Sequence, residues 1–323
     1  MYSIQYLEKI NSIQEHLPEK AGVFLTDENT HQCFNRIGIA SERVIVVPQG
    51  EGSKSLEIAR EIWSRMLDLG LTRQDYMVCI GGGMITDLGA FCATSFKRGI
   101  KYIHVPTSLL GMVDASIGGK NAVNFNHIKN LIGTFSEPDK IIICTEFLES
   151  LPKREMISGY AEMIKHALIE DRNIWAKLNT LENLEAPPSL EMIRDASTVK
   201  GNVVVKDFTE QNIRKLLNFG HTAGHAIESL MIELEQPVSH GEAVAAGMII
   251  ESHISSAKGL LSGEDMNEIV EKLQTWYAPI KWAKDQNATL LSFAMQDKKR
   301  NDHMLNCTLL QAIGKGVIDQ NVT

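Results

Sequence analysis

The sequence predicts an α/β N-terminal domain with a doubly wound, Rossmann-like parallel sheet, followed by an all-helical C-terminal domain. Two observations predict this division. Up to about residue 150, short apolar runs rich in β-branched residues alternate with amphipathic stretches, which is the pattern of βαβ units. Beyond Leu151-Pro152 the strand signals nearly vanish and helical periodicity takes over. The predicted domains are therefore residues 1–150 and 151–323.

The individual elements are predicted from these runs in chain order. Strands are expected at residues 22–25, 44–47, 77–80, 102–105 and 141–144, with helices at 55–69 and 88–96 between some of them. In the second half, helices are expected at residues 154–169, 190–205, 222–234, 241–258 and 264–276. Two stretches are predicted to be loops, namely 113–121, with its Gly-Gly-Lys, and Ala186-Pro187-Pro188-Ser189.

Composition and charge exclude several classes of protein. The 323 residues are 44% hydrophobic and 22% charged, which is ordinary for a globular protein. No run of about 18 apolar residues and no signal peptide is found, so we expect a cytoplasmic protein that does not enter a membrane. The net charge of −8 argues against a nucleic-acid partner. Five cysteines without CxxC spacing predict reduced, mostly buried thiols.

Three separated motifs supply one carboxylate and two imidazoles. Glu162, His221 and His240 form the two-histidine, one-carboxylate set that is typical of a catalytic zinc site with an open fourth position. A zincin helix is disfavoured, because Thr222 stands where its catalytic Glu would follow the first His. The structural alternative is that His221 and His225, one turn apart, make only local hydrogen bonds. Small residues beside each histidine motif favour the site instead, because glycine allows close backbone approach.

The carboxyl ends of the predicted strands are polar or rich in glycine. Strand 77–80 runs directly into Gly81-Gly82-Gly83 and then a helix, an arrangement that suits a pyrophosphate at a helix N-terminus. This is not the G-x-G-x-x-G fingerprint, and taken alone a tight structural turn is an equal alternative. Three other strand ends, at residues 26–29, 48–55 and 106–108, are also polar. Together they favour a nucleotide crevice.

Positive charge is scattered through an otherwise acidic chain. A single loop lysine is usually only solvated, but six cations stand near the motifs above and would attract an anionic small molecule if they were gathered in one pocket. They are Arg98, Lys120, Lys129, Lys165, Lys200 and Arg214.

These motifs, taken in order, resemble those of the 3-dehydroquinate synthases, within the sugar-phosphate cyclase group. The resemblance covers nearly the whole length. It rests on residues 50–55 (GEGSKS), 81–87 (GGGMITD), 97–99 (KRG), 113–120, 129–130 (KN), 161–165 (AEMIK), 214–225, 240–242 (HGE) and 297–299 (DKK).

The resemblance implies an NAD- and metal-dependent lyase of the shikimate pathway, which makes the precursors of aromatic amino acids. Its substrate would be the anionic sugar phosphate 3-deoxy-D-arabino-heptulosonate 7-phosphate, converted to 3-dehydroquinate and phosphate. The implied steps are transient oxidation by NAD, phosphate elimination, re-reduction, ring opening and intramolecular aldol closure. The metal would be zinc or cobalt, and the family suggests a homodimer.

The resemblance also assigns roles to single positions. Glu162, His221 and His240 match the metal ligands. The catalytic and substrate-binding positions match Asp87, Arg98, Asp114, Lys120, Asn130, Glu162, Lys165, Lys200, Arg214, Asn218, His225, and one of Lys298 and Lys299. Among these, Arg98 is expected to reach across from the partner subunit. The cofactor positions match Asp27, Glu51, Lys54, Gly82, Gly83, Asp87, Thr107, Ser108, Lys120 and Lys129.

Some positions depart from the family pattern and keep alternatives open. The departures are Ser108, Asn121, Ile128, Phe208, Gln211 and Asn212. The N-terminus is also short, with about twenty residues before the first expected strand, so an edge strand is expected to be missing. One alternative is a cyclase acting on sedoheptulose 7-phosphate or glucose 6-phosphate. A metal-dependent polyol dehydrogenase and an inactive binding homologue are the others. Retention of Asp114, Lys120, Lys165, Lys200 and Arg214 favours a carboxylated substrate.

Overall fold

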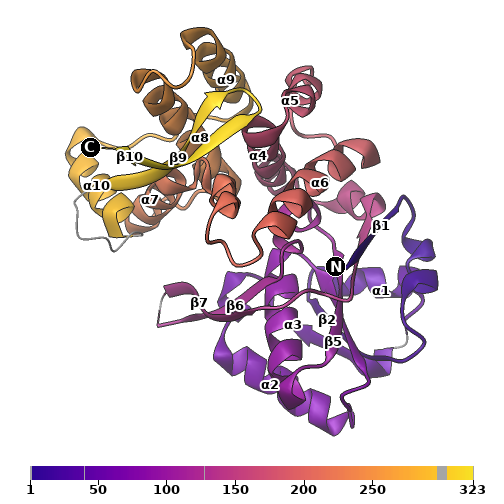
Figure 1. The fold of residues 1–323 in the computed structure, drawn as a ribbon. Coiled ribbons are helices and arrows are strands. Elements are labelled where there is room, and N and C mark those ends of the chain that lie inside the picture. The colour runs from indigo at the N-terminus through magenta and orange to yellow at the C-terminus, as the bar shows by residue number, and fades with distance from the viewer. Residues whose placement is uncertain (1, 40, 127, 297–303, 323) are drawn as a thin grey trace. The chain divides into compact units, whose positions relative to one another are not determined.

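The computed structural model describes residues 2–39, 41–126, 128–296 and 304–322. They divide into two compact units, which are described separately below. The first unit comprises Met1–Pro152 with Pro187–Ser197, and the second comprises Lys153–Ala186 with Thr198–Thr323. The chain is coloured along its length in Figure 1. None of the helices in the described ranges is both long and apolar enough to cross a membrane.

The first unit is built on a six-stranded parallel sheet. From one edge to the other, the strands are β1 (Ser3–Leu7), β8 (Lys140–Cys144), β5 (Lys101–Pro106), β4 (Tyr76–Gly81), β2 (Ala21–Asp27) and β3 (Val44–Val47). Every neighbouring pair is parallel. Because a parallel sheet is covered on both faces, its central strands are nearly continuous apolar runs, as in β4 and β8. The predicted doubly wound sheet is confirmed.

The N-terminus differs from the expectation of a missing edge strand. Residues 3–7 form β1, which pairs in parallel register with β8, from Ser3 opposite Lys140 to Leu7 opposite Cys144. The strand was not predicted because its alternation is short and its side chains are only half buried, which is usual at a sheet edge.

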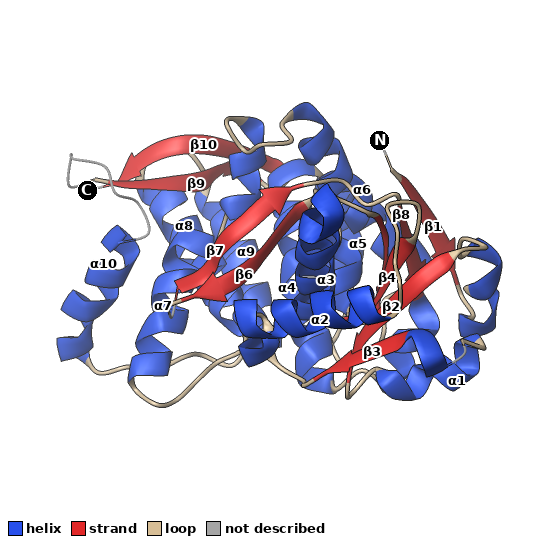
Figure 2. Ribbon diagram, turned by 90° about the horizontal axis from the view of Figure 1, so that it is seen from below, coloured by secondary structure: helices blue, strands red, loops and turns tan. Residues whose placement is uncertain are grey.

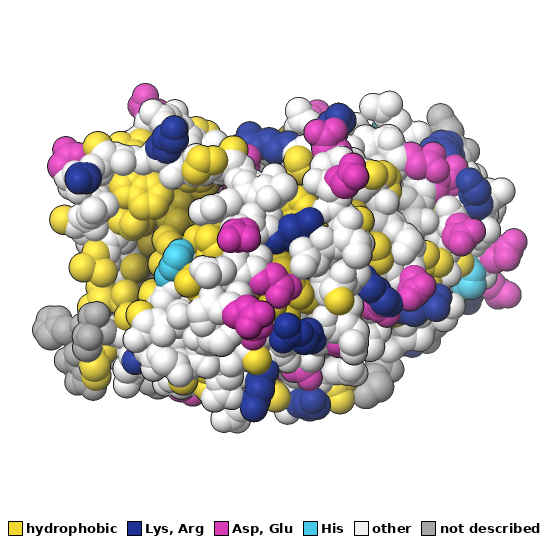
Figure 3. All heavy atoms as spheres, turned by 90° about the horizontal axis from the view of Figure 1, so that it is seen from above, with side chains coloured by type: hydrophobic (Ala, Val, Ile, Leu, Met, Phe, Trp, Pro, Cys, Tyr) yellow, Lys and Arg dark blue, Asp and Glu magenta, His cyan; other side chains and the backbone are white. Residues whose placement is uncertain are grey.

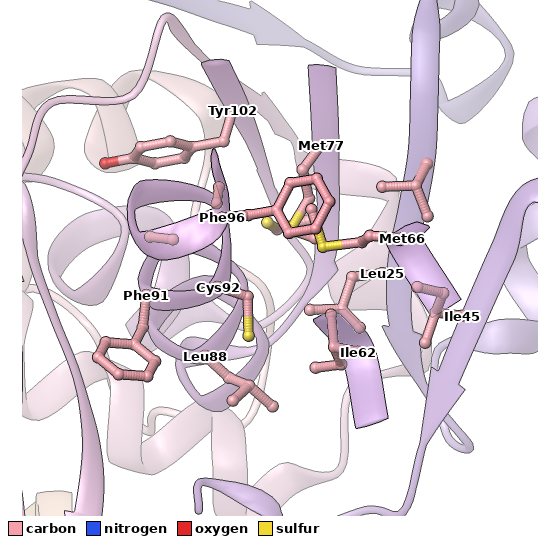
Figure 4. Close-up of a cluster of buried hydrophobic side chains, with 14 of the residues drawn as sticks. Leu25, Ile45, Ile62, Met66, Met77, Leu88, Phe91, Cys92, Phe96 and Tyr102 are labelled. Carbon is pink, nitrogen blue, oxygen red and sulfur yellow. The ribbon is translucent and has the colours of Figure 1, made fainter. Parts of the chain in front are cut away.

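Helices α2 (Leu56–Asp68) and α3 (Gly83–Ser95) pack with the sheet to form the main core of the first unit. Figure 4 shows part of this core, with Ile62 and Met66 of α2 close to Leu25 and Met77 of the sheet. Helix α3 lies close to β4, since a Cβ on Gly89 would lie 2.3 Å from Sγ of Cys79. The first unit also contains the short helix α1 (Phe34–Ile37).

A two-stranded antiparallel hairpin, which the sequence did not predict, follows β5. Its strands are β6 (Lys120–Phe125) and β7 (Ile128–Phe135), visible beside α2 and α3 in Figure 2. The turn residues Gly118 and Gly119, both at positive φ, favoured a loop and concealed the strand that follows them. Val123 is buried in the core cluster, and Ile132 packs against it.

The second unit is mainly helical, as predicted. Its helices are α4 (Lys153–Glu170), α5 (Arg172–Asn179), the later part of α6 (Leu190–Lys206), α7 (His221–Glu233), α8 (His240–Ala257), α9 (Gly263–Trp276) and α10 (Asn287–Gln296). Apolar side chains of this unit reach the surface on the face drawn in Figure 3. Ile227 and Met231 of α7 are buried with Ala243 of α8, and partly buried apolar residues such as Leu234 and Ile250 pack against them.

The second unit also contains a hairpin, so the prediction of an all-helical domain was too narrow. Strands β9 (Leu305–Ala312) and β10 (Lys315–Val322) are antiparallel. Gly314, at φ 83°, makes the turn between them, which suits a residue without a Cβ. The hairpin is fixed to α8, because the N–H of Leu310 donates to Oγ of Ser255 at 3.0 Å.

Candidate active site

Three helices of the second unit bring Glu162, His221 and His240 together. Glu162 lies in the middle of α4 and is 1% exposed, while the two histidines are the first residues of α7 and α8. Oε1 of Glu162 lies 3.5 Å from Nε2 of His221 and 3.4 Å from Nε2 of His240. All three ligand atoms lie within 4.8 Å of one another.

These separations fit a tetrahedral metal ion. Zinc–ligand distances of about 2.0–2.1 Å and tetrahedral angles place neighbouring ligand atoms about 3.3–3.4 Å apart. The two Glu162 distances agree with this value within about 0.2 Å. One carboxylate and two imidazoles leave a fourth position for water or substrate, as in catalytic zinc sites. The residues therefore fit one divalent ion.

The second nitrogen of each imidazole is held by the protein, which fixes the ring so that Nε2 faces Glu162. Nδ1 of His221 lies 3.1 Å from the carbonyl oxygen of Phe219. Nδ1 of His240 lies 3.6 Å from the carboxylate of Glu228. A carbonyl or carboxylate behind a histidine ligand orients the ring and selects the tautomer that binds metal.

Without a bound metal, the pKa values of His221 and His240 are shifted in opposite directions. Burial, followed by the charge of Lys165, lowers the pKa of His221 to about 3, so its ring is neutral at pH 7. Burial also lowers the pKa of His240, but hydrogen bonds to Glu162 and Glu228 outweigh that effect and raise it to about 9. A metal ligand must be deprotonated, so metal binding at His240 displaces a proton.

Further polar residues of the second unit surround this cluster. Lys165, one turn beyond Glu162 on α4, pairs with its carboxylate and is 2% exposed. The ring centroid of His225 lies 5.3 Å from that of His221 and 6.0 Å from that of His240. Lys200 of α6 is also buried, at 6% exposure. Of these three predicted site residues, Lys165 and Lys200 are thus buried, and His225 is in ring contact with both ligand histidines.

Arg214 and Asn218 lie on a 3-10 segment, η9 (Ile213–Asn218), that precedes α7. The loop before it is pinned by Asp207, whose carboxylate accepts the N–H groups of Gln211, Asn212 and Arg214 at 2.9, 2.6 and 3.1 Å. Burial opposes ionisation of Asp207, but these three donors outweigh it and lower its pKa. The side chain of Arg214 is 2% exposed and donates to the carbonyl of Phe208.

The residues predicted to form a nucleotide crevice lie at the carboxyl ends of β2, β3, β4 and β5 in the first unit. Gly82 is the N-cap of α3, and its lack of a side chain leaves the first amides of that helix open to a ligand. Space there is limited: a Cβ on Gly82 would lie 3.4 Å from Oγ of Ser108, and one on Gly83 would lie 3.1 Å from Cβ of Ala115. Oγ of Ser108 also accepts the N–H of Gly111 at 3.1 Å.

Other predicted crevice residues lie at neighbouring strand ends. Thr107 follows β5, and its N–H donates to the carbonyl of Gly81 at 3.0 Å. Asp27 ends β2 and is 9% exposed, and its Oδ1 accepts from both the N–H and the hydroxyl of Thr30 at 2.8 Å. Glu51 is half exposed and accepts the side-chain amide of Asn124 at 3.0 Å.

Lys54 forms hydrogen bonds with two other predicted residues of the first unit. Its Nζ lies 2.5 Å from Oδ2 of Asp87, on α3, and 2.5 Å from Oδ1 of Asn130, on β7. Lys120 begins β6 and Lys129 precedes Asn130 on β7, and both side chains are exposed. The unexpected hairpin is therefore the element that carries Lys120, Lys129 and Asn130.

Arg98 and Asp114 lie on short helical turns of the first unit. Arg98 is exposed at the end of the 3-10 turn η6 (Phe96–Arg98), with φ 66°. Asp114 lies in the π-helical turn η7 (Gly111–Ala115) and is half buried. Lys298 and Lys299 lie outside the described residues.

The structure also places residues that sequence reasoning missed. Glu210 accepts the side-chain amide of Asn218 at 3.2 Å, and Glu228 supports His240. Glu228 has a recognisable signal, since it follows His225 by three residues on one helix face. Glu251, which is fully buried on α8, has no such sequence signal, because nothing in its apolar helix indicates which backbone groups form hydrogen bonds with its carboxylate.

Comparison with known proteins decides the family. The family model described as 3-dehydroquinate synthase N-terminal matches residues 44–158, and the C-terminal model matches residues 159–300. The chain belongs to the 3-dehydroquinate synthase family. A 3-dehydroquinate synthase from Parabacteroides distasonis is 36% identical over 93% of this chain and 87% of its own length. One from Streptococcus pneumoniae (strain JJA) is 39% identical over 84% of this chain and 76% of its own length.

Solved structures share the fold of this 3-dehydroquinate synthase family member. A 2-deoxy-scyllo-inosose synthase, in complex with carbaglucose-6-phosphate, NAD+ and Co2+, is 26% identical with a TM-score of 0.88, covering 99% of this chain and 94% of its own. A 2-epi-5-epi-valiolone synthase from Streptomyces hygroscopicus subsp. jinggangensis 5008, with NAD+ and Zn2+ bound, has a TM-score of 0.87 at 24% identity. The match covers 100% of this chain and 93% of the synthase chain. The second likeness concerns the fold alone.

Proposed function

We propose that this chain is an NAD- and metal-dependent lyase that converts 3-deoxy-D-arabino-heptulosonate 7-phosphate into 3-dehydroquinate and phosphate. The observation that carries the proposal is the Glu162–His221–His240 cluster, with its 3.4 and 3.5 Å spacings, in a chain that matches the family from residue 44 to residue 300. The shikimate pathway is the corresponding process.

The cofactors supply chemistry that the side chains lack: when bound, a divalent ion acts as a Lewis acid on a substrate hydroxyl, and NAD accepts and returns a hydride. Glu162, His221 and His240 hold the ion through Oε1 and the two Nε2 atoms. Phe219 and Glu228 keep those imidazoles in the metal-binding orientation.

In the first unit, the amides of Gly82 and Gly83 at the start of α3 bind the pyrophosphate of NAD, because a helix N-terminus favours an anion. Asp27 binds a ribose, and Glu51, Thr107, Ser108 and Lys129 lie along the cofactor. Lys54 holds Asp87 and Asn130 in place through its two short contacts.

The substrate carries a phosphate and a carboxylate, and each needs cationic partners. Lys120, Asn130 and His225 bind the phosphate, with one of Lys298 and Lys299. Lys165, Lys200 and Arg214 bind the carboxylate and ring hydroxyls. Asp87, Asp114 and Asn218 are further positions of the substrate site. Burial of Lys165 and Arg214, each 2% exposed, supports this role, because a cation shielded from water binds an anion more strongly.

Phosphate release by the purified, metal-loaded chain tests the function. With NAD, the heptulosonate phosphate should release phosphate without net NADH, whereas sedoheptulose 7-phosphate and glucose 6-phosphate should release none. Release from one of the latter two alone would make the chain a different cyclase. Steady NADH formation with a polyol would make it a dehydrogenase, and metal and NAD binding without turnover would make it an inactive homologue.

The same proposal includes a homodimer in which Arg98 serves the partner's site. Its side chain is exposed, and Gly99 at φ 107° follows it in a tight turn. Sedimentation of the full chain should give twice its 35.9 kDa mass. Mixing an Arg98→Ala chain with a Glu162→Gln chain should restore activity in the mixed dimer, and no restoration would remove Arg98 from the partner's site. The cytoplasmic location stays a prediction.

A further inference from the structure

Helix α7, which begins with His221, lacks the means to cap its own N-terminus. Its N-cap is Gly220, which has no side chain, and its third residue is Ala223, which cannot accept a hydrogen bond. Helix α8, which begins with His240, has a complete capping box: Oγ of Ser239 accepts the N–H of Glu242, and the Glu242 carboxylate accepts the N–H of Ser239. The two ligand-bearing helices therefore begin differently.

Glycine is required at position 220 by the packing of α7 on α8. Gly220 has φ 78°, a conformation that favours glycine. A Cβ there would lie 2.5 Å from Cγ of Met248 and 2.9 Å from the carbonyl oxygen of Val244, both on α8. The N-cap that packing demands is therefore one that cannot supply a capping oxygen.

A single side chain of α8 caps α7 instead. Oε2 of Glu251 accepts the N–H of Gly220 at 2.5 Å, and Oε1 accepts the N–H of Ala223 at 3.1 Å. These are the N-cap and third-residue amides, the same two that a capping box satisfies. Glu251 is 0% exposed, and the positive end of the α7 dipole favours a carboxylate there.

We propose that Glu251 is a positioning residue for the metal centre, because it fixes the first turn of α7, and with it His221, to the helix that carries His240. His221 lies between the two amides that Glu251 accepts. Its Nε2 must stay within tenths of an ångström of the position set by the metal. Loss of one of these bonds frees the turn to rotate and moves Nε2 away from Glu162. The inference rests on the proposed ligand set.

The decisive variant is Glu251→Gln, which keeps the volume of the side chain but turns one acceptor into a donor. Its NH2 group then faces a backbone N–H, so one of the two bonds is lost. The matched control is Glu268→Gln, the same change on α9, where the Glu268 carboxylate accepts the Nε1–H of Trp175 at 2.5 Å and the side-chain amide of Asn179 at 3.2 Å. Both variants should lower the unfolding temperature of the metal-free chain, but only Glu251→Gln should weaken metal binding.

The experiment is titration of each metal-stripped full chain with Co2+, followed by its d–d absorption, and with Zn2+ against a chromophoric chelator. We expect Glu251→Gln to raise the dissociation constant at least about tenfold and to change the Co2+ spectrum, as loss of supporting contacts around a metal does. Glu268→Gln should keep both values of the unsubstituted chain.

Different results separate the possible failures. A Glu251→Gln chain with unchanged affinity and spectrum would reduce Glu251 to a cap that serves stability alone. If Glu251→Gln does not fold, Glu251→Asp decides instead: one methylene shorter, it cannot reach both amides, and an unchanged dissociation constant would overturn the inference. Failure of the unsubstituted chain to bind either ion would overturn the ligand set and the proposed function.

Discussion

Nζ of Lys54 lies 2.5 Å from a carboxylate oxygen of Asp87, although Lys54 precedes α2 and Asp87 lies in the first turns of α3. The side chains are 5% and 22% exposed, respectively. The same ammonium reaches Asn130 on β7. One buried cation therefore ties the hairpin to the helix whose N-terminus forms the proposed pyrophosphate site.

We expect Lys54→Met to destabilise the first unit by about 2 kcal/mol, because it removes the buried cation that pairs with the Asp87 carboxylate. NAD affinity should fall several-fold, since the positive charge of Lys54 no longer offsets the repulsion between the Asp87 carboxylate and the pyrophosphate. Thermal unfolding measures the change in stability, and titration with NAD, followed by the protein's intrinsic fluorescence, measures the change in affinity. Lys101→Met is the control, because Lys101 pairs with Asp139 in an exposed position and should change neither quantity. Equal effects in the two variants would contradict the role of Lys54.

Glu162→Gln should abolish metal binding at micromolar ion concentrations. The variant keeps the shape of the side chain but removes the charge that faces His221, His240 and Lys165. Metal content after dialysis and phosphate release measure the loss. Glu185→Gln serves as the control: it also neutralises an acid of the second unit, but Glu185 is exposed and pairs with Lys153. Full metal occupancy in Glu162→Gln would disprove the ligand set.

The sequence indicates this ligand set because chemistry restricts which residues can serve. One carboxylate and two imidazoles, each beside small residues, are uncommon without a site. The structure brings the three side chains together, although 78 residues separate Glu162 from His240 along the chain. The supporting groups are not predictable in the same way. Glu251 acts on backbone N–H groups, which every residue possesses, so no sequence pattern marks its partners.

The strands that the sequence failed to predict share a physical cause. β1 is a half-buried edge strand, and β6 follows two glycines that signal a turn. β10 has no fully buried side chain, and β9 is buried where it packs on neighbouring elements such as α8. Periodicity reports burial in a large core, so strands that depend on one neighbouring element give little signal. The central strands, buried on both faces, were predicted correctly.

His104 should make the folded chain less stable in acid. It lies on β5, is 4% exposed, and its Nδ1 has no hydrogen-bond partner among the described residues. Burial lowers its pKa to about 3, below the usual value of about 6.5. The unfolded chain therefore binds the proton first. This contribution to stability is constant above pH 6.5 and falls below it by up to about 1.4 kcal/mol per pH unit, until about pH 3.

The measurement is the free energy of urea unfolding between pH 7 and pH 4.5 for the unsubstituted chain and for His104→Leu. The variant lacks the titrating group, so its stability should fall less steeply below pH 6.5, whatever cost the substitution has at pH 7. Other titrating groups are common to both chains and cancel in the difference between the two curves. Parallel curves would show that His104 is protonated equally in the folded and unfolded states.

Gly247→Ala should separate the two histidine-bearing helices. A Cβ on Gly247 would lie 1.9 Å from the carbonyl oxygen of Gly220 and 2.7 Å from the N atom of Gly224. Both are backbone atoms of the start of α7, so no side chain can move aside. We expect a loss of about 3 kcal/mol in stability, together with weaker Co2+ binding, because His221 moves with its helix.

Gly201→Ala is the matched control, since nothing lies within 4 Å of its Cβ and alanine favours a helix by about 0.5–1 kcal/mol. It should raise the unfolding temperature and leave the Co2+ affinity unchanged. If Gly247→Ala bound Co2+ as tightly as the unsubstituted chain, close contact between α7 and α8 would not be what holds His221 in place.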